Sequence, residues 1–197
     1  GAGTPRLHVS VTGTAPIERV EVRNGLNAVQ TFYPFCKDDL GQRIKIVWSG
    51  AEVRGRARMV VWNGSLRVKR NTIRKVVPIN FWRPDRLPER VGSQRIAWES
   101  VTTGGVAGLI LTLSKSHEGL LEIQTQQRNL RCEIKSIGLK PRTWDCTGVG
   151  KKIDFYRLPD RRSRSTFSFD LPLPRLRKGD NPIYIRMDQE DGHMAWT

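Results

Sequence analysis

Residues 183–197 read IYIRMDQEDGHMAWT, and this stretch shows what kind of structure the chain builds. Apolar residues occupy every second position on both sides of the pair Asp191-Gly192. Alternation of period two is typical of a strand with one buried face, and Asp-Gly supplies the positive φ angles of a type I′ turn. The stretch therefore predicts a β-hairpin. The returning strand has hardly begun at Trp196, so we expect the chain to be a fragment of a longer protein.

The same alternation continues through the rest of the chain. Further runs begin near residues 7, 17, 44, 59, 73, 96, 109, 120, 130, 153 and 167, and Asn63-Gly64 predicts a second hairpin inside the run that begins at residue 59. No window has apolar residues at helical spacing over three turns. Short strands with one polar face each indicate antiparallel sheets rather than a parallel α/β sheet. We predict an all-β fold, an antiparallel β-sandwich of immunoglobulin-like or jelly-roll-like type, with little or no helix.

Length and charge limit the organisation of the chain. Its 197 residues fit one large all-β domain or two small ones. We expect a single sandwich over residues 1–197, with a possible subdivision near 82–95, a stretch of two prolines and several arginines that must form a loop.

The 34 Lys and Arg against 19 Asp and Glu leave a net charge of +15. Such a field attracts polyanions, or it serves solubility or an acidic partner domain.

Cysteine usage leaves the cellular compartment open. Cys36, Cys132 and Cys146 include no Cys-x-x-Cys pair, so neither a zinc ribbon nor a redox motif is indicated. Cys132 and Cys146 are either bridged or, as we prefer, buried thiols. No segment approaches the ~20 apolar residues of a membrane-spanning helix.

The residues that catalysis requires are scattered. The three histidines lie far apart in the sequence, and neither a nucleophile elbow nor a phosphate-binding loop occurs. Only Asp188, Glu190, Asp191 and His193 stand close together, either as potential metal ligands or, the reading we favour, as the polar residues of a turn. We therefore predict no catalytic residue, no metal site and no cofactor in this chain.

Two features indicate binding rather than catalysis. Arg54, Arg56 and Arg58 alternate with other residues, which on a strand would place three guanidinium groups on one face. Such a ladder either binds an anionic ligand or protects an exposed edge from aggregation. Trp82, in the loop rich in arginine and proline, and Trp62, beside a turn, are the tryptophans best placed to form exposed platforms for sugar rings, whereas Trp48 and Trp98 fit the core.

Several motifs together resemble a known family. They are PIERVEVRNG (16–25), WSGAEVRGR (48–56), WNGSL (62–66), PINFW (78–82), NPIYIR (181–186), QEDGH (189–193) and AW (195–196). The chain resembles the C-terminal region of a large, mostly bacterial family of uncharacterised proteins that is grouped with the PHP (polymerase and histidinol phosphatase) metal-dependent phosphoesterases. The resemblance spans nearly the whole chain.

The resemblance implies that the histidine-rich metal site belongs to an N-terminal domain of the same polypeptide, outside this chain. No catalytic residue can be carried over to a position here, and the family pattern continues beyond Trp196. Glu190, Asp191 and His193 are our choice of residues to face that absent site.

Three functions compete on these observations. The first is a non-catalytic accessory β-sandwich of a metal-dependent hydrolase, with an exposed apolar strip beside residues 190–197. The second is a module that binds a carbohydrate or another polyanion through Trp82 and the three arginines. Nucleic-acid binding ranks lowest, because the chain lacks the paired aromatic residues on adjacent strands that sheet-based RNA binders use.

Overall fold

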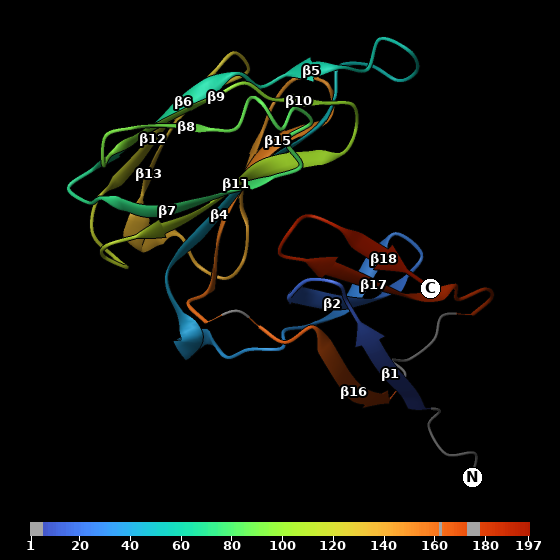
Figure 1. Cartoon of the computed structure of the whole chain (residues 1–197). Helices are drawn as coiled ribbons and strands as arrows, with labels where there is room; N and C mark the ends of the chain where they lie inside the picture. The colour runs from blue at the N-terminus through green and yellow to red at the C-terminus, as the bar shows by residue number, and fades with distance from the viewer. Residues whose placement is uncertain (1–5, 162, 173–177) are drawn as a thin grey trace. The chain divides into compact units, whose positions relative to one another are not determined.

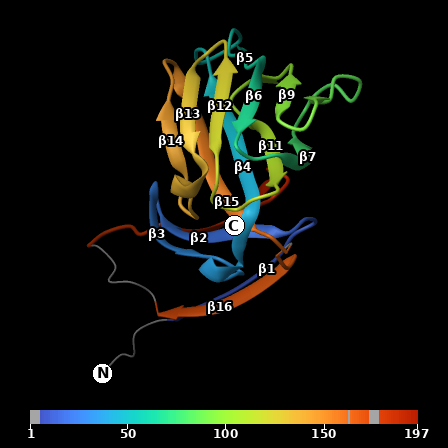
Figure 2. The same ribbon diagram turned by 90° about the vertical axis from the view of Figure 1, so that its left-hand side faces the viewer.

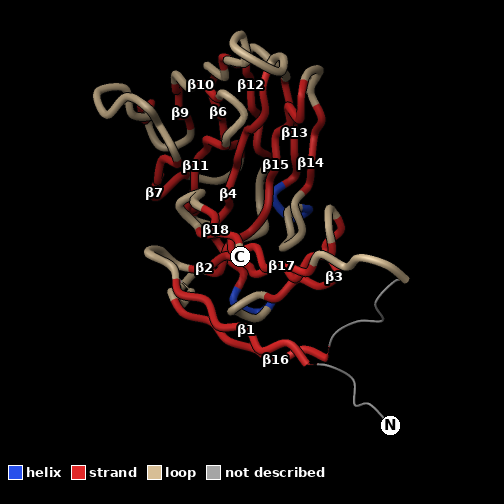
Figure 3. Tube along the Cα trace, turned by 90° about the vertical axis from the view of Figure 1, so that its right-hand side faces the viewer, coloured by secondary structure: helices blue, strands red, loops and turns tan. Residues whose placement is uncertain are grey.

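Antiparallel strands make up most of the computed structural model, which describes residues 6–161, 163–172 and 178–197. Figure 3 shows helix only in short segments, and within the described residues these are the 3₁₀ turns η1 (Lys37–Asp39) and η2 (Ile134–Ser136). The predicted all-β, sandwich-like fold with little helix is confirmed. None of the helices described is long and apolar enough to cross a membrane.

The chain divides into two compact units that are nested in the sequence. The smaller unit combines Gly1–Cys36 with Arg161–Thr197, and the larger unit is the continuous segment Lys37–Asp160. Residues 82–95, the subdivision considered from the sequence, lie inside the larger unit. This stretch contains the short β8 (Glu89–Val91) and ends at the first residue of β9 (Arg95–Trp98), so the expected loop is present at 82–88 but does not separate two domains.

The larger unit contains two five-stranded sheets (Figures 1 and 2). The first has the order β14 (Arg142–Asp145), β15 (Val149–Pro159), β4 (Leu40–Ala51), β11 (Val106–Leu113) and β7 (Ile73–Ile79). The second has the order β13 (Asn129–Glu133), β12 (Leu120–Thr125), β6 (Gly64–Lys69), β9 (Arg95–Trp98) and β8. A two-stranded ribbon joins β5 (Val60–Val61) to β10 (Val101–Thr102).

Alternating apolar residues from both sheets form the main core of this unit. Ile44, Ile46 and Trp48 of β4 are almost fully buried and belong to the same cluster as Leu66 of β6. Trp48 also stacks on Trp98 of β9, with ring centroids 5.0 Å apart, so the predicted core positions of both tryptophans are confirmed. Burying such large aromatic surfaces stabilises the sandwich strongly.

The smaller unit closes around a second, separate core. Its four-stranded sheet has the order β18 (Met194–Trp196), β17 (Ile183–Gln189), β2 (Ile17–Asn24) and β3 (Asn27–Phe32). A ribbon of β1 (Arg6–Thr12) and β16 (Thr166–Pro172) contributes Val9 and Leu171 to the same apolar cluster as the inner residues of β2 and β17. Phe32 stacks on Phe169 at a centroid distance of 3.8 Å.

The hairpin predicted at residues 183–197 is present, but its turn differs from the expected type I′. β17 pairs with β18, and the loop between them is closed by hydrogen bonds from Gly192 N to Gln189 O (3.1 Å) and from Gln189 N to His193 O (2.9 Å). Gly192 has a φ of 88°, whereas Asp191 does not adopt a positive φ. A three-residue loop with glycine in the left-handed region matches this pattern, so only the glycine needs the special conformation.

The hairpin predicted at Asn63-Gly64 is wrong. β5 pairs with β10, and β6 pairs with β9 and β12, so the two strands on either side of Asn63 do not pair with each other. A Cβ atom on Gly64 would lie 2.3 Å from the carbonyl oxygen of Gln124. Glycine is therefore needed here for close approach of two backbones rather than for a turn.

Candidate functional site

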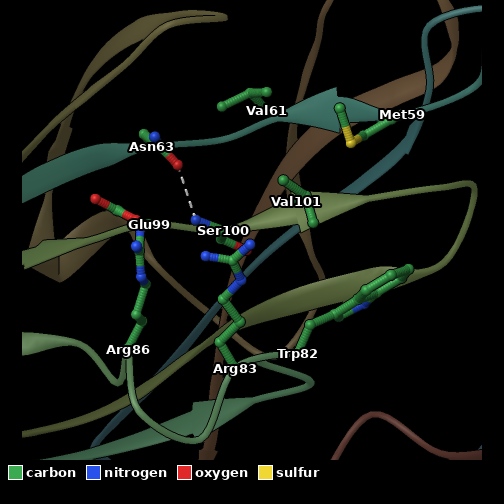
Figure 4. A pocket seen from close by; sticks show the side chains of 9 residues that line it. All are labelled: Met59, Val61, Asn63, Trp82, Arg83, Arg86, Glu99, Ser100 and Val101. Carbon is green, nitrogen blue, oxygen red and sulfur yellow. Dashed lines mark hydrogen bonds and ion pairs between the residues drawn. The ribbon is translucent and has the colours of Figure 1, made fainter.

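A pocket of about 490 Å³ opens on the larger unit, between the loop that follows β7 and the β5–β10 ribbon (Figure 4). The loop contributes Trp82, Arg83 and Arg86. The opposite side consists of Met59, Val61 and Val101, with Asn63, Glu99 and Ser100 beside them. This volume lies within the range of small-ligand sites, which combine apolar walls with a few polar groups.

The loop exposes Trp82 because its neighbours fix the chain on either side. Asn80 adopts a φ of 51° at the end of β7, and its side-chain amide donates to Val106 O at 3.0 Å. Phe81 then packs edge-on against Trp48 of the core, with centroids 6.3 Å apart. The next side chain, Trp82, is left 67% exposed. The predicted exposed position of Trp82 is therefore present, on a loop anchored by Asn80 and Phe81.

A tight turn carries the two arginines of the pocket. Arg86 N donates to Arg83 O at 3.1 Å across Pro84 and Asp85, and proline is favoured at the second position of such a turn. The Arg86 guanidinium forms an ion pair with Glu99, and that hydrogen bond raises the pKa of Arg86. Both side chains of the pair are half exposed, so the pair stabilises the fold little but links the loop to the strand side of the pocket.

Hydrogen bonds to buried tryptophans hold the opposite side of the pocket. Ser100 is buried, its hydroxyl accepts from Trp48 Nε1 at 3.0 Å, and its backbone N–H donates to Asn63 Oδ1 at 3.0 Å. Trp62 is fully buried and donates from Nε1 to Thr102 Oγ1 at 2.8 Å, so the alternative that Trp62 forms an exposed platform is wrong. The polar groups of this side are therefore fixed before any ligand binds.

Charge in and around the pocket is positive. The larger unit carries 24 Lys and Arg against 12 Asp and Glu, a net charge of +12 of the chain's +15. Within the pocket, Glu99 is neutralised by Arg86, whereas the side chain of Arg83 has no hydrogen bond or ion pair to any residue that the structure describes. Figure 4 shows the Arg83 side chain extending from the loop toward Ser100.

Arg54, Arg56 and Arg58 do not form the predicted ladder on a strand. They lie in the arginine loop, residues 52–59, which joins β4 to β5, and all three are exposed. The strand alternation ends because Gly55 adopts a φ of 100° and Glu52 N donates to Arg58 O at 3.2 Å across the loop. The last residue of this loop, Met59, lines the pocket, so the structure does bring the arginine loop to the same site as Trp82.

Glu190, Asp191 and His193 lie in the smaller unit, in the loop between β17 and β18. Asp191 accepts from the backbone N–H of His193 and lies 3.1 Å from its ring Nδ1, whereas Glu190 is buried and donates its backbone N–H to Pro16 O. Among the residues that the structure describes, no three His, Cys, Asp or Glu side chains gather as a potential metal site. The three residues therefore form a polar turn in this unit.

Comparison of the chain with family models, with curated proteins and with solved structures finds no match. The resemblance to the PHP-related family therefore stays a prediction. What the pocket can do has to be argued from its own chemistry.

Sequence reasoning identified Trp82 but missed the other polar residues of the pocket. Arg83 stands next to Trp82 in the sequence, and this adjacency was the one signal that could have found it. Asn63 looked like a turn residue, and Ser100 fell inside the alternating run that begins near residue 96. The chain instead passes from β9 to β10 at Glu99 and Ser100, which brings both residues to the pocket.

Proposed function

We propose that the chain is a non-catalytic binding module and that the pocket beside Trp82 holds a saccharide ring. The observation that carries this proposal is a 67%-exposed indole on one side of a pocket of about 490 Å³. An exposed indole beside a pocket offers a flat apolar surface that a ligand in that pocket can cover. The loop is anchored on either side of Trp82, by the packing of Phe81 on Trp48 and by the ion pair of Arg86 with Glu99. These anchors hold the backbone that carries the indole.

A sugar ring matches the chemistry of the pocket. A pyranose presents C–H groups on its flat face, which pack on the electron-rich face of an indole, and hydroxyl groups around its rim. Donors for those hydroxyls are present in the guanidinium of Arg83 and the amide nitrogen of Asn63, neither of which has a partner among the described residues. Val61, Val101 and Met59 supply apolar surface on the other side.

The ionisable groups of the pocket support binding rather than hydrolysis. Glycoside hydrolysis uses two carboxyl groups on either side of the scissile bond. Glu99 is the one carboxylate among the described residues of the pocket, and it is paired with Arg86. A bound saccharide would therefore meet one paired carboxylate rather than the acid and base pair that glycoside hydrolysis uses.

A panel of immobilised oligosaccharides tests this function. We expect the purified chain to be retained by at least one saccharide and to release no reducing ends from it after prolonged incubation. Retention by none of the panel would contradict the binding function. Release of new reducing ends by the pure chain would contradict its non-catalytic character.

A second candidate function is an accessory role beside a hydrolase domain of the same polypeptide, and one observation favours it. Met194 and Trp196 on the edge strand β18 are 41% and 54% exposed, which matches the apolar strip expected for such a module. Trp196 is partly supported by Arg186, whose guanidinium lies 5.0 Å from the ring centroid. Amide hydrogen exchange at β18 should then be slower in the full-length gene product than in this chain, and equal exchange would contradict the role.

A further inference from the structure

We propose that the saccharide bound beside Trp82 is acidic, and that its carboxylate or sulfate group binds Arg83. This inference rests on the proposed function and adds the chemical class of the ligand. It is carried by the charges of the pocket, which are independent of the aromatic surface that suggests a sugar. A guanidinium binds carboxylate and sulfate through paired N–H donors, so either group satisfies the same site.

Arg83 differs from other well-placed cations of the larger unit in having no partner. Arg86 pairs with Glu99, Lys151 pairs with Glu52 at 2.6 Å, and Arg157 donates to backbone carbonyl groups. The Arg83 side chain is exposed and lines the pocket, and it has neither a carboxylate nor a carbonyl partner among the described residues. Water solvates this guanidinium when no ligand is bound, and an acidic group of a ligand in the pocket replaces that water with paired hydrogen bonds.

The geometry of the loop places the aromatic ring and the cation next to each other. Trp82 and Arg83 are consecutive, and the hydrogen bond from Arg86 N to Arg83 O fixes the turn that follows them. The acidic group of a uronic acid or a sulfated sugar projects from the edge of the ring. When the face of that ring lies on the indole, the charged group is therefore presented toward the neighbouring side chain. Little reorganisation is needed, which favours affinity.

The arginine loop extends the positive charge beyond the pocket. Arg54, Arg56 and Arg58 are exposed, their side chains have no partner among the described residues, and Met59 joins this loop directly to the pocket. Clustered like charges increase the rate at which an anionic ligand arrives. An acidic chain longer than one sugar could thus contact Arg83 at the bound ring and the arginine loop with its next residues.

The test compares acidic saccharides with uncharged forms of the same saccharides. It also compares the loss of an arginine inside the pocket with the loss of one outside it. Trigalacturonate is titrated against its methyl ester, and a κ-carrageenan oligosaccharide, whose galactose backbone is neutral, against its desulfated form, by isothermal titration calorimetry. The protein is the full chain as wild type, Arg83→Gln, Trp82→Ala and the control Arg74→Gln, an exposed arginine of β7 outside the pocket. The first ligand pair reports on carboxylate, and the second on sulfate.

We expect one acidic ligand to bind at least about tenfold more tightly than its uncharged counterpart, the size of effect that a charge-assisted hydrogen bond gives. Arg83→Gln should remove most of that difference and weaken binding of the acidic form much more than binding of the uncharged form, whereas Arg74→Gln should leave both unchanged. Trp82→Ala should weaken binding of both forms.

The remaining outcomes separate the two proposals. Equal binding of the acidic and uncharged forms, lost in Trp82→Ala, would overturn the acidic ligand and leave the saccharide function standing. Binding of none of the four ligands would overturn both proposals. Acidic binding that falls equally in Arg83→Gln and Arg74→Gln, and that single-stranded DNA reproduces, would be general electrostatic attraction and would overturn the inference.

Discussion

Arg157 is a buried arginine whose guanidinium is in contact with no carboxylate of the residues that the structure describes. Only 2% of the residue is exposed, and its guanidinium donates to four carbonyl groups, those of Gly41, Ser116, Ile134 and Ile137. Burial lowers the pKa of Arg157, which Asp160 opposes. One planar side chain thereby satisfies carbonyl groups from the start of β4, the loop after β11 and η2, which a shorter or apolar residue could not do.

We predict that Arg157→Met destabilises the chain by about 3 kcal/mol or more, because each carbonyl left buried without a partner costs about 1–3 kcal/mol. Arg157→Lys should recover only part of this loss, since an ammonium group has three donors and no planar fork. The free energy of unfolding in urea is the measurement. The control Arg74→Met, on an exposed side chain, should change it by about 0.5 kcal/mol or less. Equal effects of the two Met variants would contradict this account.

Cys132 and Cys146 are separate thiols and not a bridge; Cys132 is buried as predicted, whereas Cys146 is only half-buried. Cys36 is exposed, Cys132 is buried, and burial raises the pKa of the Cys146 thiol. Because only the thiolate reacts, a raised pKa leaves less reactive form at a given pH.

We therefore predict fast labelling of Cys36 by a thiol reagent at pH 8 and slow labelling of Cys146. The rate at Cys146 should rise with pH above the range where an ordinary thiol ionises, and Cys132 should react only after unfolding. Mass spectrometry of labelled peptides measures all three rates. Labelling of Cys132 as fast as Cys36 in the folded chain would contradict the structure.

At the scale of single residues, the sequence predicts well what depends on neighbours along the chain. The alternation around Trp48 places it in the core, and the prolines around Trp82 keep it off a strand; both predictions hold. The exposure of Trp62 was predicted wrongly because its burial depends on a residue far away in the sequence. Its indole N–H donates to the hydroxyl of Thr102, which lies on β10. The places of Asn63 and Ser100 in the pocket were missed for the same reason.

At the scale of elements, strand existence was predictable and strand pairing was not. The hairpin of β17 and β18 is local, so its residues alone specify it. The sequence around Asn63 has an equally strong local signal, yet β6 pairs instead with β9 and β12. The pairing is decided by which apolar faces meet in the core, and no short window contains that information.

Gly64 offers a test of this explanation at the element scale. We predict that Gly64→Ala destabilises the chain by about 1–3 kcal/mol, since the new methyl group would press on the carbonyl oxygen of Gln124. Gly105 is the matched control, because a Cβ there meets nothing within 4 Å and its φ is not in the left-handed region. Gly105→Ala should be neutral or stabilise by up to about 1 kcal/mol. The measurement is the change in unfolding temperature of both variants. A Gly64→Ala variant as stable as the wild type would contradict the close approach of the Gly64 and Gln124 backbones.

At the scale of the whole molecule, the nested arrangement explains why the sequence suggested a subdivision near 82–95 and not the boundaries at 36/37 and 160/161. β1 pairs with β16 and β2 pairs with β17, so the smaller unit joins segments more than a hundred residues apart. Both units consist of the same kind of alternating strands, and composition does not change where the chain passes from one to the other. The chain enters and leaves the larger unit at neighbouring points, where Asp160 N donates to Asp39 O at 2.9 Å.

We predict that residues 37–160 fold on their own, because this segment contains complete sheets, the main core and hydrogen bonds that join its two ends. It also holds five of the six tryptophans, so its folding can be followed by near-ultraviolet circular dichroism. Cooperative unfolding with a near-ultraviolet spectrum close to that of the whole chain is expected. A spectrum without fixed aromatic signals would show that the segment needs the rest of the chain.

The most direct test of the central claim is a comparison of the two exposed tryptophans, Trp82 in the pocket and Trp196 on the smaller unit. The dissociation constant of the best-retained oligosaccharide is measured by calorimetry for the wild type, Trp82→Ala and Trp196→Ala. We predict that Trp82→Ala weakens binding by about tenfold or more, as the loss of a central aromatic contact does, and that Trp196→Ala leaves it unchanged. Unchanged binding in Trp82→Ala would contradict the claim that this pocket binds the saccharide.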